Sequence, residues 1–198
     1  MVRRRGVGHA GYVEILVAGG QTGVDRAAMD VALTLGIHCA GWCPRGRRAE
    51  DGAIPARYPL RETPSSTTLQ RTLWNLRRSD ATLILCRKRP IGGTALTIGL
   101  MRRLNKPLLV VNPMDRKASA AARNWLIGLR IQTLNIAGPR ASQDPMIHDA
   151  VTQFLFRLLQ HQPDTDGRSR FRKLPTTTSA AHPSVAESRG GGRHTQKA

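Results

Sequence analysis

Short apolar runs alternate with segments of helical periodicity along the middle of the chain. Runs rich in aliphatic and β-branched residues are typical of strands buried on both faces of a sheet, and they cover residues 13–18, 81–86, 107–111 and 131–137. Between and after them, apolar residues recur three and four positions apart, which is typical of helices; these segments cover residues 24–35, 66–79, 95–105, 119–129 and 146–160. This alternation predicts βαβ units. The expected fold is an α/β three-layer Rossmann-like sandwich with a mainly parallel sheet of four to five strands.

The same periodicity predicts which side of each helix faces the core. The inward positions are Val24, Ala27, Ala28, Val31 and Leu35 in the first helix, Leu69, Leu73 and Leu76 in the second, Leu96, Leu100 and Leu104 in the third, and Ile147, Val151, Phe154 and Leu158 in the last. Gly36 is expected to end the first helix. Residues 38–60 are punctuated by Gly and Pro and are predicted to be mostly loop.

Composition divides the chain into three parts. Residues 1–12 form a basic N-terminal arm, residues 13–162 form the Rossmann-like ligand-binding domain, and residues 163–198 form a basic tail with almost no aliphatic residues. A segment of that composition cannot bury enough apolar surface to offset the entropy of ordering. The tail is therefore predicted to be disordered.

The chain is strongly basic, with 31 Lys and Arg against 13 Asp and Glu and a formal net charge of +18. Such a charge attracts nucleotides, nucleic acid and acidic lipid headgroups. A host whose proteins are generally basic would explain the charge equally well. Aromatic residues make up 4% of the chain and leave few rings for stacking bases, which disfavours recognition of single strands. No apolar run reaches the ~18 residues of a membrane span, and the N-terminal arm lacks the apolar core of a signal peptide. We expect a cytoplasmic protein without a membrane partner.

The turn after the first strand, AGGQTG, is the first candidate for a ligand site. Glycines followed by a helix N-terminus present backbone N–H groups and a positive dipole to an anion. The turn lacks the lysine of a P-loop, and the GVGHAG string at residues 6–11 precedes the strand, where a dinucleotide fingerprint has no structural context. A plain strand-to-helix turn is the alternative, and helix capping is the alternative for Asp25. The candidate ligand residues here are Gly19, Gly20, Thr22, Gly23 and Asp25.

Two further loops are predicted to reach the same edge of the sheet. PIGGTALTIG places Gly92, Gly93 and Thr94 between a strand and a helix, and AGPRAS places Arg140 and Ser142 after the last strand. Loops that follow parallel strands emerge at the carboxyl edge, where open α/β sheets bind ligands. The three loops together predict one anionic ligand held from several sides.

The segment GWCPRGRRAEDG gathers charged residues. Arg45 and Arg48 could pair with phosphate or carboxylate groups, while Glu50 and Asp51 could orient a hydroxyl or act as acid and base. A solvated charged loop is the alternative. His38, Cys39 and Cys43 lack a fourth ligand at suitable spacing, so no metal site is predicted, and Cys39 and Cys86 are expected to be buried apolar residues.

Five segments together resemble a known family. They are GGQTGVDRAAMDVALTLGI, GWCPRGRRAEDGAIPARYPLRET, RTLWNLRRSDATLIL, GGTALT and NIAGPRAS, and they run in order from about Val13 to Leu159. The chain resembles the molybdenum-cofactor carrier family, the circularly permuted YpsA branch of the LOG-like (SLOG) superfamily of Rossmann-type nucleotide-binding proteins. The resemblance implies a nucleotide or another phosphate-bearing ligand at the carboxyl edge. Molybdopterin carries a phosphate and is one candidate, so the molybdenum cofactor is the one bound cofactor that the resemblance suggests.

The wider superfamily includes phosphoribohydrolases that cleave the N-glycosidic bond of nucleoside monophosphates. Their glycine loop has the form P-G-G-x-G-T with a glutamate shortly after it, whereas PIGGTALT matches only in part and is followed by no acidic residue before Asp115. A catalytic carboxylate would have to come from Glu50, Asp51 or Asp25. This departure disfavours enzymatic activity.

Three hypotheses therefore follow from the sequence. The first is a carrier or sensor of a phosphate-bearing, nucleotide-like ligand, with the molybdenum cofactor as one candidate. The second is a nucleotide N-glycosidase that uses Glu50 or Asp51, and the third is a basic protein that binds nucleic acid. Self-association is expected only by analogy with superfamily relatives.

Overall fold

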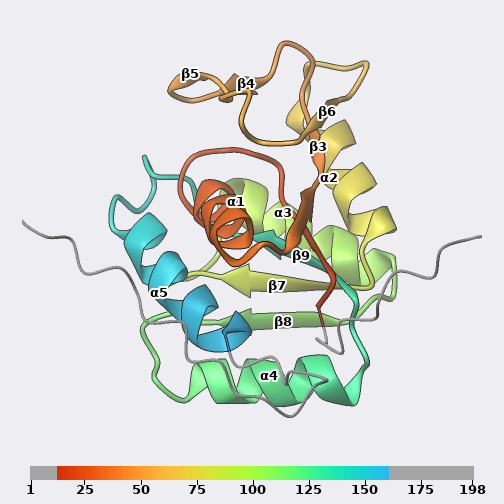
Figure 1. Ribbon diagram of the computed structural model, residues 1–198. Helices are drawn as coiled ribbons and strands as arrows, with labels where there is room; N and C mark the ends of the chain where they lie inside the picture. Colours follow the sequence, from red (N-terminus) through yellow and green to blue (C-terminus); the bar gives the residue numbers. More distant parts are fainter. Residues whose placement is uncertain (1–12, 161–198) are drawn as a thin grey trace, which may run out of the picture. The chain divides into compact units, whose positions relative to one another are not determined.

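The computed structural model describes residues 13–160, which form a parallel five-stranded sheet with helices on both faces (Figure 1). The strand order is β2-β1-β9-β7-β8. The strands are β1 (Ile15–Val17), β2 (His38–Ala40), β7 (Ala81–Leu85), β8 (Leu108–Val111) and β9 (Thr133–Ala137). The predicted α/β Rossmann-like sandwich is confirmed. The basic arm at 1–12 and the tail at 163–198 lie outside the described residues.

Two crossovers leave the middle of the sheet in opposite directions. Helix α1 (Val24–Leu35) joins β1 to β2 at one end, and α3 (Gly92–Arg103) joins β7 to β8 at the other. Since parallel crossovers are right-handed, the two helices lie on opposite faces. Helix α2 (Thr68–Arg78) packs beside α3, whereas α4 (Ala118–Gly128) packs against α5 (Ile147–Leu159), which in turn packs against α1.

Strand β9, the last in the chain, lies in the middle of the sheet between β1 and β7. Leu134 pairs with Leu16 of β1, and Ile136 pairs with Leu83 of β7. All five residues of β7 are buried. The core is completed by α5, whose predicted inward residues Ile147, Val151, Phe154 and Leu158 are all fully buried.

The segment predicted to be mostly loop holds more regular structure than its Gly and Pro residues indicate. Its first residues form β2, which pairs with β1. Further on, β3 (Trp42–Cys43) pairs in parallel with β6 (Arg61–Glu62), and β4 (Arg48–Ala49) forms a small hairpin with β5 (Gly52–Ala53). Strands β3 to β6 are only two residues long, which is why hydrophobic periodicity does not reveal them.

Two side chains hold the segment between β2 and β6 in place. The Asn75 side chain on α2 accepts a hydrogen bond from the Trp42 N–H at 2.8 Å and donates one to the Trp42 carbonyl at 3.1 Å. The Arg47 guanidinium donates to four backbone carbonyls between residues 54 and 60 at 2.9–3.2 Å. Arg47 therefore folds the segment instead of projecting its charge into solvent.

The predicted inward face of the third helix is wrong. Leu96 is 46% exposed, and the residues of α3 that face the core are Thr94, Thr97 and Met101. Thr97 is tolerated there because its hydroxyl donates to the Gly93 carbonyl at 2.9 Å. In α2 the prediction holds for Leu76, which is 1% exposed, but not for Leu69 near the helix start, which is 45% exposed.

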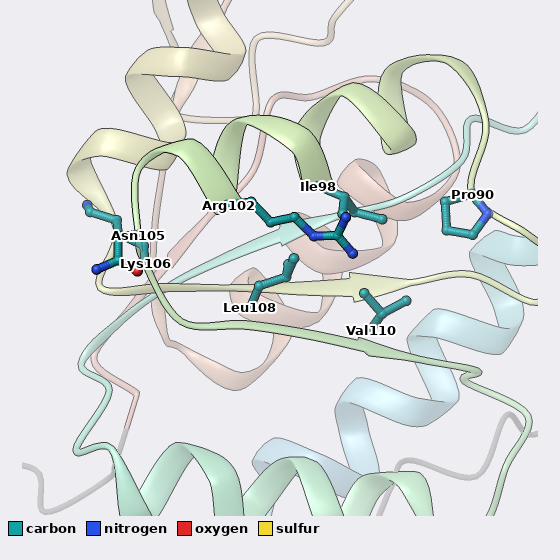
Figure 2. Close-up of a pocket in the computed structure, with 7 residues that line it drawn as sticks. All are labelled: Pro90, Ile98, Arg102, Asn105, Lys106, Leu108 and Val110. Atoms are coloured by element: carbon teal, nitrogen blue, oxygen red, sulfur yellow. The ribbon is translucent and has the colours of Figure 1, made fainter.

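Strand β8 is an edge strand, and an open groove runs between it and α3 (Figure 2). The groove has a volume of about 700 Å³ and includes Ile98 and Arg102 of α3 and Leu108 and Val110 of β8. No helix among residues 13–160 is long and apolar enough to span a bilayer.

Candidate functional site

Three loops meet at the carboxyl edge of the sheet because β9 lies between β1 and β7. They are the β1–α1 loop at 18–23, the β7–α3 loop at 86–91 and the β9–α5 loop at 138–146. The β9–α5 loop contacts both of its neighbours: Val24 N–H donates to the Pro139 carbonyl at 3.3 Å, and Asp144 forms an ion pair with Arg87. The structure thus brings together the three loops selected from the sequence.

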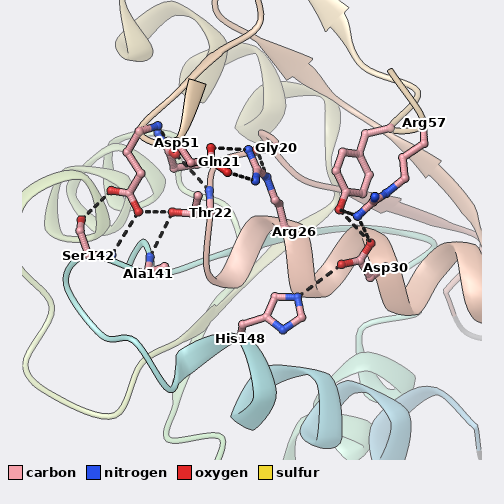
Figure 3. Close-up of polar contacts among 12 residues, drawn as sticks. Gly20, Gln21, Thr22, Arg26, Asp30, Asp51, Arg57, Ala141, Ser142 and His148 are labelled. Carbon is pink, nitrogen blue, oxygen red and sulfur yellow. Dashed lines mark hydrogen bonds and ion pairs between the residues drawn. The ribbon is translucent and has the colours of Figure 1, made fainter. Parts of the chain in front are cut away.

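The carboxylate of Glu50 joins the β4–β5 hairpin to two of these loops, at Thr22 and Ser142; both partners are labelled in Figure 3. It accepts hydrogen bonds from the Thr22 hydroxyl, from the Ser142 hydroxyl at 2.5 Å and from the Ser142 N–H at 3.1 Å. Thr22 Oγ1 in turn accepts from the Ala141 N–H at 3.1 Å. Partial desolvation acts to raise the pKa of Glu50, but these hydrogen bonds and the nearby charge of Arg140 bring it below its usual value.

Two more contacts fasten the same hairpin. The Gln21 side-chain oxygen accepts from the N–H groups of Thr22 and Glu50, both at 3.0 Å. The Arg26 guanidinium binds both carboxylate oxygens of Asp51, with Nη2 to Oδ1 at 2.7 Å. The hydrogen bond from Arg26 lowers the pKa of Asp51. Both acidic residues proposed for catalysis are therefore ionised and already bound by the protein's own donors.

The N–H groups of the β1–α1 loop face an internal anion. Asp25 is 5% exposed, and its carboxylate accepts from Gln21 N–H at 3.3 Å and from the Gly19 backbone. Arg71 of α2 approaches the same oxygen at 3.3 Å. Burial raises the pKa of Asp25, although Arg71 and the two backbone groups act in the opposite direction. The carboxylate of Asp25 thus uses loop N–H groups of the kind expected to bind a phosphate.

The glycines of the β1–α1 loop are required by contacts inside the protein. Gly23 has φ +74°, and a Cβ there would lie 2.6 Å from the Pro139 carbonyl oxygen. A Cβ at Gly19 would lie 1.8 Å from Nη1 of Arg71. At Gly23 the neighbours are backbone atoms, so packing alone accounts for the glycine, whereas at Gly19 a Cβ would displace the end of the Arg71 side chain.

The start of α3 differs from the β1–α1 loop, because it leaves open space beside Gly93. A Cβ at Gly93 would have no neighbour within 4 Å among residues 13–160, and, as at the other described helices, no side chain there caps the N-terminus of α3. Beside it lies a cleft of about 60 Å³. Its lining includes Cys86, Lys88, Arg89, Thr94, Gln143 and Asp144. An uncapped helix N-terminus beside two cations attracts anions.

The β7–α3 and β9–α5 loops are fixed to each other by a bidentate ion pair. Arg87 Nε donates to Asp144 Oδ2 at 2.7 Å, and a second bond joins Nη2 to Oδ1. Asp144 is 4% exposed, and the hydrogen bonds from Arg87 lower its pKa. Gly92, with φ +51°, lies close enough to Gln143 that a Cβ would meet its Nε2 at 3.5 Å.

Several residues of the cleft were missed from the sequence. The cleft is also lined by Lys88, Arg89, Gln143 and Asp144. The basic run CRKRP, directly after a buried strand, was the available signal for Lys88 and Arg89. In contrast, Arg45 and Arg48 are exposed, and within residues 13–160 neither forms an ion pair.

A second polar cluster has a structural role. Asp30 of α1 accepts from the Tyr58 hydroxyl at 2.8 Å and lies 3.3 Å from Nε2 of His148 on α5 (Figure 3). Arg57 approaches both Asp30 and Tyr58. Burial is the largest cause of the raised pKa of Tyr58. The cluster connects α1, α5 and the segment between β5 and β6.

The cysteines are free and buried, as expected for Cys39 and Cys86. Burial raises the pKa of Cys39 to about 11 and also raises that of Cys86, so both thiols are protonated at neutral pH. Across the described part of the chain, no three His, Cys, Asp or Glu side chains are grouped so that they could hold a metal ion.

Comparison with known proteins agrees with this architecture. Residues 16–159 match the circularly permutated YpsA SLOG family. The chain belongs to this family. The protein in a crystal structure of a "putative molybdenum carrier protein" from Syntrophus aciditrophicus shares 40% sequence identity with the chain at a TM-score of 0.73. The match covers 75% of this chain and 96% of that one. No curated protein matches the chain.

Proposed function

We propose that this SLOG-family protein carries or senses a phosphate-bearing small ligand whose phosphate binds at the N-terminus of α3. The observation that carries the proposal is the cleft at the start of α3, which Thr94 and the exposed cations Lys88 and Arg89 line; Gly93, the residue before Thr94, has open space around its Cβ position. Backbone N–H groups at an uncapped helix start, the Thr94 hydroxyl and two positive charges are the donors that a phosphate requires. Arg140 on the neighbouring loop adds positive charge at the same edge.

The molybdenum cofactor is the leading candidate ligand. Its phosphate suits the donor set of the cleft, whose volume of about 60 Å³ suits a phosphate-sized group and not a whole pterin. The name of the Syntrophus protein describes it as a molybdenum carrier. That this chain has the same role is part of the proposal. The residues that would hold the cofactor are Gly92, Gly93, Thr94, Lys88 and Arg89. A nucleotide presents the same phosphate and is the competing ligand.

The N-glycosidase hypothesis is less favourable, because the candidate carboxylates are already bound by other groups of the protein. A glycosidase needs a carboxyl that is free to donate a proton, activate water or approach the sugar. Glu50 is held by three donors and Asp51 by Arg26, while Asp25 is buried against Arg71. These bonds would have to break before any of the three acted.

Native mass spectrometry of the freshly purified full-length protein, followed by denaturation and identification of released compounds, tests the proposal. A released pterin phosphate or nucleotide would identify the ligand class. Gly93→Asp places a carboxylate at the helix start and should abolish co-purification. Gly99→Asp is the matched control, because Gly99 is also free of neighbours within 4 Å and lies about 9 Å further along the same helix. Equal ligand content in both variants would contradict the site.

A further inference from the structure

The β7–α3–β8 segment lacks acidic residues. Residues 81–114 contain no Asp or Glu, although the whole chain has 13. Two of its cations have internal partners: Arg87 pairs with Asp144, and Lys106 Nζ donates to three carbonyls at the end of α2 at 2.6–3.0 Å. Arg102 forms no ion pair with any residue between 13 and 160.

Arg102 lies on the groove between α3 and β8 (Figure 2). Its side chain extends beside Ile98, above Leu108 of the strand. Val110 forms another part of the floor and is 42% exposed. The groove therefore combines an apolar floor with an unpaired positive charge.

The backbone beside this floor is also free to pair. The carbonyls of Pro107 and Val111 accept hydrogen bonds from the N–H groups of Thr82 and Cys86. One side of β8 is therefore used for pairing with β7. Because successive residues of a strand point their N–H and C=O groups to opposite sides, Leu108 and Val110 direct theirs away from the sheet. No strand within residues 13–160 pairs with this edge, and β8 itself carries no charged residue or proline to protect it.

We propose that β8 accepts an acidic, extended segment of a partner protein as an added strand. Apolar side chains of that segment would cover Leu108 and Val110, and a carboxylate would pair with Arg102. This mode takes its affinity from main-chain hydrogen bonds and its specificity from alternate side chains. The proposal does not rest on a ligand at the α3 N-terminus, since Arg102, Leu108 and Val110 do not line the cleft there, although Pro90 lines both the groove and the cleft.

Charge complementarity selects this occupant over two others. A second copy of the chain pairing through the same edge would bring its own Arg102 to a groove that already holds a cation, which disfavours such pairing. A nucleic acid would satisfy the charge but would leave the apolar floor and the free strand edge unused.

The test uses the ¹⁵N-labelled full-length protein and a capped decapeptide of alternating Glu and Val as the probe. The expected result is binding at least tenfold tighter than that of the matching Lys–Val peptide, with slowed exchange of the Leu108 and Val110 amide protons. Arg102→Glu should weaken the Glu–Val peptide at least tenfold. Arg130→Glu makes the same charge change at another exposed position and should leave binding unchanged.

Three results would overturn the proposal. Equal binding by the wild type and the Arg102→Glu variant would show that the groove is not the site. Displacement of the peptide by a 20-nucleotide DNA strand, with the same amide protons protected, would assign the groove to nucleic acid. Sedimentation of the free protein as a dimer that Val110→Glu dissociates would make the edge a self-interface.

Discussion

The Thr22 hydroxyl donates a hydrogen bond to the carboxylate of Glu50, 28 residues later in the chain. This hydrogen bond joins the turn after β1 to the β4–β5 hairpin. Ser142, in the loop after β9, donates two more hydrogen bonds to the same carboxylate. A residue considered for catalysis is thus the point at which three separate segments are fastened. Its replacement is expected to affect stability first.

Glu50→Gln should lower the free energy of unfolding by about 1 kcal/mol. An amide keeps the shape of the carboxylate but loses the charge that strengthens the bonds from Thr22 and Ser142, and the exposure of the site limits the loss. Urea unfolding measures the change. Glu14→Gln is the control, because Glu14 is exposed and has only a 3.4 Å side-chain contact with Gln132. Equal stability of the two variants would contradict the role given to Glu50.

Stability should fall as the pH is lowered through the range in which Glu50, Asp51 and Asp144 become protonated. Each has a pKa below its ordinary value of 4.5 or 3.8 in the folded chain. Their contribution is therefore complete above the unfolded-state pKa and is lost as the pH falls through the folded-state pKa. Asp25, whose pKa is raised, acts with the opposite sign. Unfolding measured from pH 7 down to pH 3 should show a decline that is shallower in Glu50→Gln.

Removal of one partner of the Asp25–Arg71 pair should be more costly than removal of both. Asp25→Asn leaves the partly buried Arg71 guanidinium, 17% exposed, without its counter-charge, and breaking a largely buried pair in this way costs about 3 kcal/mol. The double variant Asp25→Asn/Arg71→Met should recover part of that loss. Denaturant unfolding of the four proteins in a double-mutant cycle gives the coupling energy. Additive losses would show that the two side chains do not interact.

The sequence predicted the elements that depend on local periodicity. The core face of α5 was correct because four apolar residues repeat at helical spacing with no competing stripe. In α3 the leucines formed the clearer stripe, but Thr94 and Thr97 face the core, where Thr97 bonds its own helix. Periodicity cannot identify a threonine whose hydroxyl is satisfied internally.

The sequence predicted which loops meet at the edge of the sheet, but not the side-chain contacts between them. Loops after parallel strands share one edge, and this rule correctly grouped the segments around Thr22, Gly93 and Arg140. The partners of Glu50 are 28 and 92 residues away from it in sequence. No local pattern shows that this carboxylate is satisfied by other side chains, so a structural acid and a catalytic acid look alike in the sequence.

Gly23→Ala should destabilise the protein, whereas Gly93→Ala should not. At Gly23 a Cβ would lie 2.6 Å from a backbone oxygen at positive φ, so we expect a loss of about 2 kcal/mol or more. At Gly93 the space is open, and alanine should be neutral or stabilise the helix by up to about 1 kcal/mol. Thermal unfolding of both variants tests this. Weaker retention of any ligand found by native mass spectrometry, in a Gly93→Ala protein of normal stability, would separate binding from folding.

The charges beside α3 should control binding of a phosphate-bearing ligand. Lys88→Ser/Arg89→Ser removes two cations that line the cleft and have no ion-pair partner within residues 13–160. The fold should be preserved, because both side chains are exposed. Affinity for a nucleoside monophosphate, measured by titration calorimetry, should fall at least tenfold in the double variant and should decline with added salt in the wild type. The control variant Arg45→Ser/Arg48→Ser loses the same charge at exposed positions outside the cleft. It should bind the nucleoside monophosphate as tightly as the wild type does. Equal losses in the two double variants would mean that overall charge, and not the α3 cleft, attracts the ligand.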